Sequence, residues 1–430
     1  MKIVLINPPH PYLADQKRNQ PLGIMYLAAM LEKENYDVQL VDLCNTDEED
    51  WIKKIPDADI FGIGSTTLDY IRSIKIAKKL KENYKCIIVL GGAHATSVPR
   101  TIDSIFDKVI IGEGERAFLD LLKDCENENH CYKNNTNRYK KFYQREQIED
   151  IDAIPFPARH LLPLDSIVNY NLVEKGKAAT SLITSRGCNY NCFFCGSKTM
   201  WGQKVRFRSA DNVIQELKQI IHDYEVYYFR FHDDTMTLNK KRLLELCKKM
   251  EPLNIHWRAH TRVDRSDMET LVAMKKAGCI ELGFGMESAS QEVLDLNNKK
   301  ITIEEARFAI KNAKKVGLKV RLFFVVGLPG ETKGTVKKNI EFIEDVQPDG
   351  VDISTFVPFP GCEIYENPQK FNIQLLTQDY EKFVMTLGLC NGEADTDFIY
   401  KHPNLTNEEL KKNRSEMLNY ITNNKMALNK

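Results

Sequence analysis

The chain has 430 residues, 43% of them hydrophobic, which is enough for two or three domains with buried cores. Lys and Arg together number 60, as do Asp and Glu, so the formal net charge is zero and gives no support for nucleic acid as a partner. The sequence shows no signal peptide, no apolar run that approaches a membrane span and no disulfide scaffold, so we expect a cytoplasmic protein in a reducing compartment.

Apolar runs alternate with helical patterns over residues 1–124. This alternation predicts a parallel, Rossmann-like doubly wound sheet with helices on both faces. Ligands of such sheets bind at the carboxyl ends of the strands. Strands are expected at 2–6, 37–43, 59–64, 86–90 and 108–111, and helices at 22–33, 70–82 and 116–123.

The loops expected at those strand ends are rich in small and hydroxyl residues, which let a backbone approach a flat ligand closely. Each loop taken singly could be a plain turn. A P-loop is excluded because no Gly-Lys-Ser/Thr occurs there, and no Gly-x-Gly-x-x-Gly opens the first helix. The candidate ligand-binding residues of these loops are Asn7, Pro8, Ser65, Thr66, Thr67, Gly91, Gly92, His94, Gly112, Glu113 and Gly114.

Residues 125–177 are polar at first and then carry Pro155 and Pro157, so they are expected to form a linker. Strands and helices alternate again over residues 178–365, which predicts a partial, TIM-like (β/α)6 barrel with its chemistry at the carboxyl ends of the strands. The expected strands are 181–184, 226–231, 255–258, 280–285, 319–326 and 350–356, and the helices are 210–223, 240–250, 266–277, 303–316 and 333–346.

The first barrel strand leads into a run of three cysteines, Cys188, Cys192 and Cys195, spaced Cys-x3-Cys-x2-Cys. Three thiolates this close can hold three irons of a [4Fe–4S] cluster and leave the fourth iron open to a ligand. An odd trio cannot pair into disulfides, and a structural zinc site needs a fourth protein ligand. Zinc remains the alternative interpretation of the spacing.

The ends of the later barrel strands also carry polar residues. Asp233 and Asp234 follow the second strand, and because they are adjacent, at most one of them faces a ligand. Either could instead cap a helix. Arg262 follows the third strand and could pair with a carboxylate or form a salt bridge at the barrel rim. Glu287 and Ser288 follow the fourth strand, and Val325 and Gly327 lie at the end of the fifth.

The cysteine spacing, with the aromatic Phe194 before the third cysteine, resembles the signature of the radical S-adenosylmethionine (SAM) enzymes. Pro21-Leu22-Gly23, the Gly-Gly-x-His loop and the Gly-Glu-Gly-Glu loop resemble the cobalamin-binding domain of one subgroup, which includes class B-type methyltransferases. The segments Gly285–Ser288 and Gly327–Thr332 match this subgroup as well. The resemblance covers residues 1 to about 365.

The resemblance implies a role for each of these residues. The three cysteines would be the catalytic and metal-binding residues of the cluster, and the open iron would bind SAM. Phe194, Asp233, Asp234, Arg262, Glu287, Ser288, Val325 and Gly327 would contact SAM, and the loops of residues 1–124 would bind cobalamin. None of the nine histidines follows an Asp two residues earlier, so the Asp-x-His-x-x-Gly cobalt ligand of other cobalamin proteins is missing. His94 would be a polar contact in its loop, with a surface histidine as the alternative.

The expected function is methylation of an unactivated carbon of a small molecule. SAM would be cleaved to a 5′-deoxyadenosyl radical, methylcobalamin would supply the methyl group, and an external donor such as a flavodoxin or ferredoxin would supply electrons. The alternatives are a cyclase or rearrangement enzyme with the same cofactors, a radical SAM enzyme that has lost cobalamin, and a non-catalytic iron–sulfur or cobalamin-binding module. Residues 366–430 are expected to form a tail that shapes the substrate cavity, with helices at 377–387 and 406–425.

Overall fold

The computed structural model describes residues 1–127, 141–384 and 398–426. The chain divides into two compact units. The N-terminal unit comprises residues 1–169 with 199–202, and the C-terminal unit comprises residues 170–198 with 203–430. The four segments predicted from the sequence, 1–124, 125–177, 178–365 and 366–430, divide the chain more finely and stay predictions.

The N-terminal unit is built on a sheet of six parallel strands in the order β2-β1-β3-β4-β5-β6. Because β1 pairs with both β2 and β3, the direction of winding reverses between β1 and β3. The strands are β1 (Lys2–Asn7), β2 (Asp37–Asp42), β3 (Ile60–Gly64), β4 (Ile87–Gly91), β5 (Lys108–Ile111) and β6 (Phe142–Gln144).

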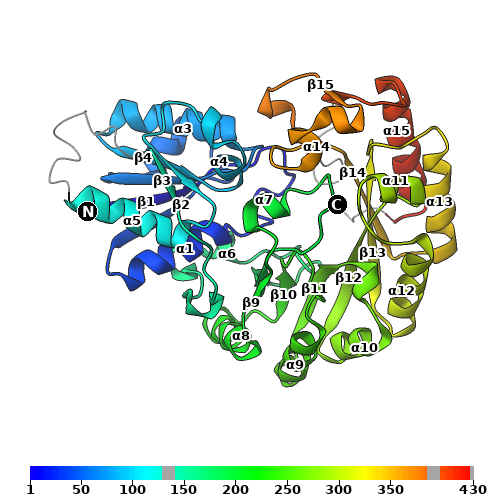
Figure 1. The fold of residues 1–430 in the computed structure, drawn as a ribbon. Helices are drawn as coiled ribbons and strands as arrows, with labels where there is room; N and C mark the ends of the chain where they lie inside the picture. The colour runs from blue at the N-terminus through cyan, green and yellow to red at the C-terminus, as the bar shows by residue number, and fades with distance from the viewer. Residues whose placement is uncertain (128–140, 385–397, 427–430) are drawn as a thin grey trace. The chain divides into compact units, whose positions relative to one another are not determined.

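Helices cover both faces of this sheet, which confirms the doubly wound fold. Figure 1 shows α1 and α5 on one face and α3 and α4 on the other. Gly62 of β3 lets helix α5 pack closely, because a Cβ there would lie 2.6 Å from Leu5 and 3.2 Å from Phe118. The helices are α1 (Leu22–Lys33), α2 (Trp51–Lys54), α3 (Tyr70–Asn83), α4 (Ala93–Ser97), α5 (Gly114–Asn127) and α6 (Leu164–Ile167).

Strand β6 falls in the segment 125–177, which was expected to be a linker with a small hairpin around residues 139–143; a parallel strand of the sheet was not expected there. Its three residues pair with β5 in parallel register, Phe142 with Val109 and Gln144 with Ile111. Only the middle residue, Tyr143, is buried. So short a strand takes its conformation from its neighbour and leaves little local pattern. Part of the predicted linker, residues 128–140, lies outside the described residues.

The C-terminal unit has six parallel strands whose order in the sheet follows their order in the chain. Each strand is followed by helix, so the predicted partial (β/α)6 barrel is confirmed. The barrel strands are β7 (Ala179–Leu182), β10 (Tyr228–Phe231), β11 (His256–Thr261), β12 (Cys279–Glu287), β13 (Lys319–Val326) and β14 (Gly350–Thr355). A short antiparallel pair, β8 (Ser185–Arg186) and β9 (Arg206–Phe207), flanks the cysteine segment.

Local capping residues begin several of the helices around this barrel. The side chains of Ser209, Asn239, Asp267 and Thr302 each accept a hydrogen bond from the backbone N–H three residues further on, which satisfies a donor at the first turn. Figure 1 shows these helices arranged outside the strands. The helices of this unit are α8 (Ala210–Tyr224), α9 (Lys240–Met250), α10 (Met268–Lys276), α11 (Gln291–Leu296), α12 (Ile303–Lys315), α13 (Thr335–Val346), α14 (Glu363–Glu366) and α15 (Asn407–Asn423). Helix α7 (Ser197–Trp201) begins in this unit, but residues 199–201 belong to the N-terminal unit.

The tail combines a helix with a strand pair. Helix α15 starts at the predicted place with a capping box of Thr406 and Glu409. The helix predicted over 377–387 is wrong where it is described: residues 377–384 contain only the 3-10 turn Tyr380–Lys382, and 385–387 lie outside the described residues. Just before it, β15 (Gln374–Leu375) pairs antiparallel with β16 (Tyr400–Lys401).

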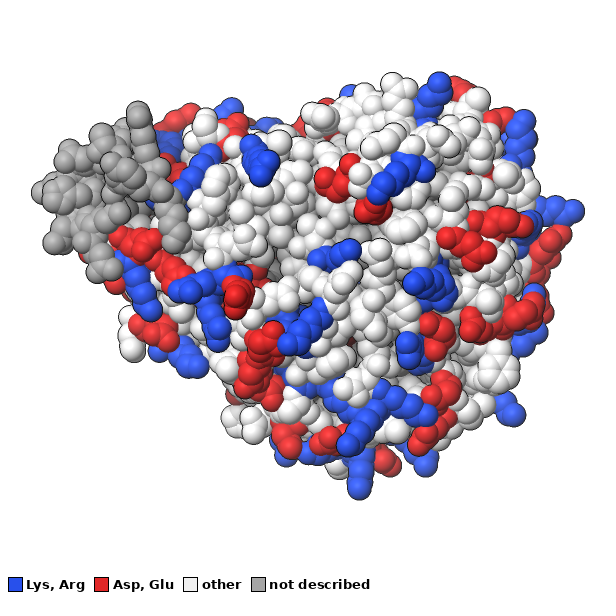
Figure 2. Space-filling model, viewed as in Figure 1, with Lys and Arg blue, Asp and Glu red and all other residues white. Residues whose placement is uncertain are grey.

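Within the described residues, no helix is both long and apolar enough to span a membrane. Side chains of both charge signs are interspersed over the face drawn in Figure 2. This mixing fits the equal numbers of acidic and basic residues in the sequence.

Candidate functional site

The first barrel strand is tied to the second where the cysteine segment begins. Asp233, which follows β10, accepts hydrogen bonds from the backbone N–H groups of Thr184 (2.6 Å) and Ser185 (2.9 Å) and from the Thr184 hydroxyl (2.5 Å). Asp233 is only 3% exposed. Both carboxylate oxygens of Asp233 thus bind the segment that leads to Cys188. A SAM molecule in contact with Asp233 would share these oxygens with Thr184 and Ser185.

The next residue, Asp234, lies on the exposed side, as the alternation of an extended segment predicts. Its carboxylate accepts a hydrogen bond from the Ser197 hydroxyl at 2.6 Å. Ser197 comes two residues after Cys195, so this contact links the cysteine segment to the end of β10.

The three cysteines lie in an irregular segment between β8 and α7. Gly187 has a φ of 103°, which favours glycine and turns the chain at Cys188. Cys188 and Cys192 are half-buried and Cys195 is exposed, and all three thiols are free. No three His, Cys, Asp or Glu side chains in the described part of the chain converge on a single ion. Three separate thiols do fit a [4Fe–4S] cluster, because there each thiolate takes its own iron.

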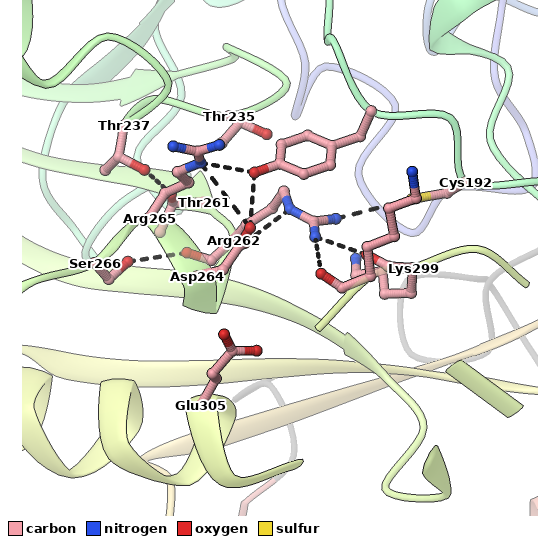
Figure 3. A network of polar contacts seen from close by, with 12 residues as sticks. Cys192, Thr235, Thr237, Thr261, Arg262, Asp264, Arg265, Ser266, Lys299 and Glu305 are labelled. Carbon is pink, nitrogen blue, oxygen red and sulfur yellow. Dashed lines mark hydrogen bonds and ion pairs between the residues drawn. The ribbon is translucent and has the colours of Figure 1, made fainter. Parts of the chain in front are cut away.

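Arg262, just after β11, joins the cysteine segment to the residues that follow α11, as Figure 3 shows. Its Nη1 donates to the Cys192 Sγ at 3.8 Å, and its Nη2 donates to the carbonyl oxygens of Lys299 (2.7 Å) and Lys300 (3.2 Å). Its Nε donates to Asp264 at 2.9 Å. Protein groups therefore engage all three guanidinium nitrogens, and the ion pair with Asp264 is the salt bridge expected as the alternative. A contact between Arg262 and SAM stays a prediction.

Tyr190, between the first two cysteines, completes this attachment. The guanidinium carbon of Arg262 lies 3.5 Å from the centre of the Tyr190 ring, a cation–π contact. The Tyr190 hydroxyl donates to Asp264 at 2.7 Å and accepts from Arg265 Nε at 2.7 Å. Burial raises the pKa of Cys192, while the nearby positive charges of Lys299 and Arg262 oppose that rise. The cysteine segment is thus held beside fixed positive charge.

Strand β12 ends in an irregularity that places Glu287. The register with β13 shifts between Gly285 and Glu287, and Glu287 has a φ of 62°. The left-handed region costs a non-glycine residue about 1 kcal/mol, so other contacts must hold this conformation. The Glu287 carboxylate pairs with Lys299 Nζ at 2.7 Å, and both side chains are largely buried. A Cβ at Gly285 would lie 2.7 Å from the Glu287 carboxylate, so this glycine makes room for the pair.

Lys299 connects these residues to the aromatic position of the cysteine segment. Its ammonium lies 5.9 Å from the centre of the Phe194 ring. The structure thus brings together four predicted residues, Cys192, Phe194, Arg262 and Glu287. Sequence reasoning missed Lys299 and Tyr190, because their partners are distant in sequence and no local motif marks them.

The remaining predicted SAM residues lie at the ends of β12 and β13. Ser288 is fully buried, and its hydroxyl donates a hydrogen bond to the side-chain oxygen of Asn339 in α13 at 3.5 Å. Val325 is half-buried within β13. Gly327 has a φ of 98°, and its carbonyl accepts the hydroxyl of Tyr400 at 2.5 Å. The tail residue Tyr400 therefore fixes the turn after β13, a contact that the sequence did not reveal.

Glu331 closes the same turn. Its carboxylate accepts the backbone N–H groups of Gly327 (2.9 Å) and Leu328 (3.2 Å). Glu331 is 1% exposed, and burial raises the pKa of its carboxyl to about 8. Nε2 of His402, a tail residue, is hydrogen-bonded to the Leu328 carbonyl oxygen at 3.0 Å. The Gly-x-Pro-Gly-Glu-Thr segment is thus a rigid turn built from its own glutamate and from two tail residues.

In the N-terminal unit, Asn7 and Pro8 lie where β1 meets the end of β2. The Asn7 amide donates to Asp42 at 2.9 Å and to the Cys44 Sγ at 3.4 Å. The Pro8 carbonyl accepts from the Cys44 thiol at 3.8 Å. These contacts fix the loop that leaves β1 at the carboxyl edge of the sheet.

The loops after β3 and β4 approach each other closely. The Ser65 N–H donates to the Gly91 carbonyl at 2.9 Å, and the His94 N–H donates to the Ser65 carbonyl at 3.2 Å. Gly92 has a φ of 96°, and a Cβ there would lie 2.6 Å from the Ser65 carbonyl oxygen. The contact between the two loops therefore explains Gly92, the second glycine of the Gly-Gly-x-His loop.

His94 is fully buried, so the alternative of a surface histidine is wrong. Its Nδ1 lies 3.2 Å from the Thr67 hydroxyl, and its ring stacks on Tyr70 with the ring centres 3.9 Å apart. Burial lowers the pKa of His94 to about 4. A neutral His94 thus holds Thr67 in its loop, while its contact with cobalamin stays a prediction.

The loop after β5 combines open space with an anchor. Gly112 has a φ of 77°, and a Cβ there would meet no atom within 4 Å, so a flat ligand can approach this backbone. Glu113 points into the protein, where its carboxylate accepts the Ile148 N–H at 2.9 Å. Gly114 begins helix α5. The glycines of this loop fit a cobalamin site, and Glu113 fixes the loop.

The sequence matches the model of the radical SAM superfamily over residues 182–343 and that of the B12 binding domain over residues 16–122. An uncharacterized methyltransferase of Pyrococcus horikoshii is 33% identical over 435 residues, which cover 96% of this chain and 90% of that protein. The chain belongs to the cobalamin-binding radical SAM enzymes. As a member of this family, it uses a [4Fe–4S] cluster, SAM and cobalamin.

Two further likenesses extend along the chain of this cobalamin-binding radical SAM enzyme. The anaerobic magnesium-protoporphyrin IX monomethyl ester cyclase of Cereibacter sphaeroides is 27% identical over 402 residues, 87% of this chain and 64% of that protein. The structure of the radical SAM methyltransferase TsrM of Kitasatospora setae, with cobalamin and a [4Fe–4S] cluster bound, has a TM-score of 0.73. It is 14% identical, and the match covers 98% of this chain and 89% of that one, so it supports the fold.

Proposed function

We propose that this enzyme methylates an unactivated carbon of a small molecule. The observation that carries the proposal is the near full-length likeness to a protein described as a methyltransferase, in a chain that has both a radical SAM and a B12 binding region. When bound, the cluster and SAM supply a 5′-deoxyadenosyl radical, and cobalamin carries the methyl group to be transferred.

In this proposal the protein binds and orients the cofactors. Cys188, Cys192 and Cys195 hold the cluster, and Arg262 and Tyr190 hold the segment that carries them. Glu287 sits at the end of β12 to contact SAM, with Lys299 neutralising its charge. The other proposed SAM contacts are Phe194, Arg262, one of the two carboxylates Asp233 and Asp234, Ser288, Val325 and Gly327.

Cobalamin binds, in this proposal, to the loops at the carboxyl edge of the N-terminal sheet. The open backbone at Gly112 and the close loops around Ser65 and Gly92 support this placement. The full set of proposed residues is Asn7, Pro8, Ser65, Thr66, Thr67, Gly91, Gly92, His94, Gly112, Glu113 and Gly114. We further propose a cytoplasmic location, because a reducing compartment keeps an open cluster intact. We also propose a flavodoxin or ferredoxin as the donor of the electron that reduces the cluster.

A second candidate uses the same cofactors without methyl transfer. It is favoured by the 27% identity to a cyclase over 87% of this chain. Both reactions would need the same radical and the same corrin, so the residues described above serve either one. The two candidates differ in whether the methyl group of SAM moves to cobalt.

This difference can be measured without knowing the substrate. We would purify the protein anaerobically from cells supplied with cobalamin and add SAM with a deuterated methyl group and a strong reductant. Methyl transfer predicts deuterated methylcobalamin and S-adenosylhomocysteine, together with 5′-deoxyadenosine. Formation of 5′-deoxyadenosine with bound corrin that stays unlabelled would contradict methyl transfer and favour the second candidate.

A further inference from the structure

The barrel sheet carries a band of charged side chains on its inner face, the face away from the covering helices (Figure 1). Over most of their length, β10, β13 and β14 alternate between buried positions, which face the helices, and half-buried positions, which face inward. Solvent therefore reaches the inner face. The charged band consists of Arg230 of β10, Arg258 of β11, Glu281 of β12, Arg321 of β13 and Asp352 of β14.

Ion pairs connect one half of this band. Arg321 donates to the Glu281 carboxylate at 3.2 and 3.3 Å and to Asp352 at 3.3 Å. Arg258 Nη1 lies 3.5 Å from the same Glu281 carboxylate. Within the described strands, the band thus holds three arginines and two carboxylates, so it carries one positive charge in excess.

The excess charge lies where two arginines stand side by side. Arg230 and Arg258 are register partners on neighbouring parallel strands, which lie about 4.8 Å apart, so both belong to the same face. Like charges directly opposite each other on neighbouring strands destabilise a sheet. Arg258 is only 9% exposed and Arg230 is half-buried, so water screens the repulsion only partly. A negative group between the two guanidinium groups would offset it.

Two histidines next to these arginines experience the same positive charge. His232 and His260 lie two residues further along the same two strands. Burial, and after it the charges of the three arginines of the band, lower the pKa of His260 to about 3. Burial and then Arg230 lower the pKa of His232 well below its usual value. Both rings are therefore neutral at pH 7, and they add hydrogen-bonding groups without adding charge.

A ligand held by this pair of arginines would extend toward the site of the reaction. Arg258 and Arg262 are four residues apart, which is about 13 Å of extended chain, and Arg262 reaches Cys192. Phe323 on the inner face of β13 is half-buried, and its ring centre lies 4.9 Å from that of His260. The inner face thus offers positive charge at one level and an apolar ring closer to the strand ends.

We infer that Arg230 and Arg258 bind an anionic group of the substrate, a carboxylate or a phosphate, on the inner face of the barrel. That the ligand is the substrate rests on the proposed function, whereas the binding of the anion does not. The guanidinium fork matches both groups, because it can donate two parallel hydrogen bonds to their oxygens. The bound end would lie below the strand ends and leave the rest of the molecule to reach them.

The test measures how the full-length protein, reconstituted under anaerobic conditions, binds small probes with one charged end. The probes are para-fluorophenylacetate and para-fluorophenyl phosphate, and the neutral match is para-fluorophenylacetamide. The width of the fluorine NMR line at increasing protein concentration gives each dissociation constant. We expect at least one anion to bind about tenfold or more tightly than the amide. The anion that binds more tightly identifies the group as carboxylate or phosphate.

Two variants locate the binding. Arg230→Gln and Arg258→Gln should each weaken anion binding about tenfold and leave amide binding and iron content unchanged, since each removes one charged donor. Arg230→Lys and Arg258→Lys serve if the glutamine variants fold poorly, and they should retain part of the affinity because lysine keeps the charge without the fork. The matched control is Arg307→Gln, since Arg307 pairs with Glu304 and Asp345 on the outer helices and its loss should not affect anion binding.

The outcomes separate this inference from the proposed function. Equal affinities for the anions and the amide would overturn it, as would the lack of saturable anion binding by the wild type or anion binding that is unchanged in both glutamine variants. Corrin that stays unlabelled by deuterated SAM would instead contradict methyl transfer and leave the anion site of Arg230 and Arg258 standing.

Discussion

Each cysteine of the predicted cluster site has different surroundings. Cys192 lies beside Arg262, the Cys195 sulfur accepts the Ser197 N–H at 3.5 Å, and Cys188 follows the left-handed turn at Gly187. None of these contacts packs a cysteine into the core. The thiols are therefore free for iron, and their loss should cost the fold little.

We expect Cys188→Ala, Cys192→Ala and Cys195→Ala each to abolish reductive cleavage of SAM, because each removes one of three iron ligands. The measurements are iron per chain and 5′-deoxyadenosine formed with excess reductant. Cys362→Ser is the control, since this thiol is fully buried next to α14 and should leave the iron content unchanged. Residual 5′-deoxyadenosine from any of the three alanine variants would contradict the ligand assignment.

The pair of Glu287 and Lys299 makes a second prediction at this scale. Glu287→Ala leaves the Lys299 ammonium buried without its partner, which should lower the free energy of unfolding by about 3 to 5 kcal/mol. It should also weaken SAM binding while the iron content is retained. Urea unfolding and equilibrium dialysis with SAM, both under anaerobic conditions, measure the two effects.

Two controls separate stability from SAM binding in this prediction. The double variant Glu287→Ala with Lys299→Ala should regain part of the stability but not the SAM affinity. Lys337→Ala breaks an exposed pair with Glu341, so it should change stability by about 0.5 kcal/mol or less and leave SAM binding intact. An unchanged SAM affinity in Glu287→Ala would show that Glu287 does not contact SAM.

Among the elements, those with a strong local pattern were predictable. The structure gives β13 and α9 the predicted bounds, because alternating apolar residues mark the strand and Asn239 caps the helix. Strand β6 and the pair of β15 and β16 were missed, since their few residues take their conformation from distant neighbours. The residues of the candidate site fall into the same two groups, those marked by a local motif and those placed by long-range contacts.

The cysteines, Phe194 and Glu287 were predictable because they lie in motifs of a few residues. Lys299 is 12 residues from Glu287, and Tyr190 is 74 residues from Asp264, so nothing local marks those pairs. His94 and Thr67, which lie 27 residues apart, are a further example from the N-terminal unit. Contacts that only the fold creates could not be derived from the sequence.

The turn after β13 gives a pH prediction. Burial raises the folded-state pKa of Glu331 from 4.5 to about 8, so between these values the folded protein binds more protons than the unfolded chain. Glu331 thus contributes stability that is fully present below about pH 4.5 and is lost as the pH rises through about 8.

Glu331→Gln should remove this dependence. The amide oxygen can still accept the Gly327 and Leu328 N–H groups, but the side chain no longer titrates. The free energy of unfolding of the wild type, relative to the variant, should therefore fall as the pH rises across this window. Urea unfolding at several pH values measures the difference. Parallel curves for the two proteins would contradict a raised pKa at Glu331.

At the scale of the whole molecule, the predicted ligands of the two cofactors belong to different units. All of the proposed cobalamin residues lie within residues 1–169, whereas the three cysteines and the proposed SAM residues lie within 170–198 and 203–430. Each unit has its own parallel sheet and its own core. Loss of one cofactor site should therefore leave the other unit folded and its cofactor bound.

This independence can be tested in both directions by measuring iron and corrin per chain in the same samples. Cys192→Ala should lose iron and keep corrin. Gly92→Val should lose corrin and keep iron, because its Cβ would lie 2.6 Å from the Ser65 carbonyl and its φ of 96° is strained for valine. Gly334→Ala is the control and should keep both cofactors, since a Cβ there would lie 3.8 Å from its nearest neighbour, the Thr332 hydroxyl oxygen. Loss of corrin from Cys192→Ala would show instead that cobalamin binding depends on the cluster.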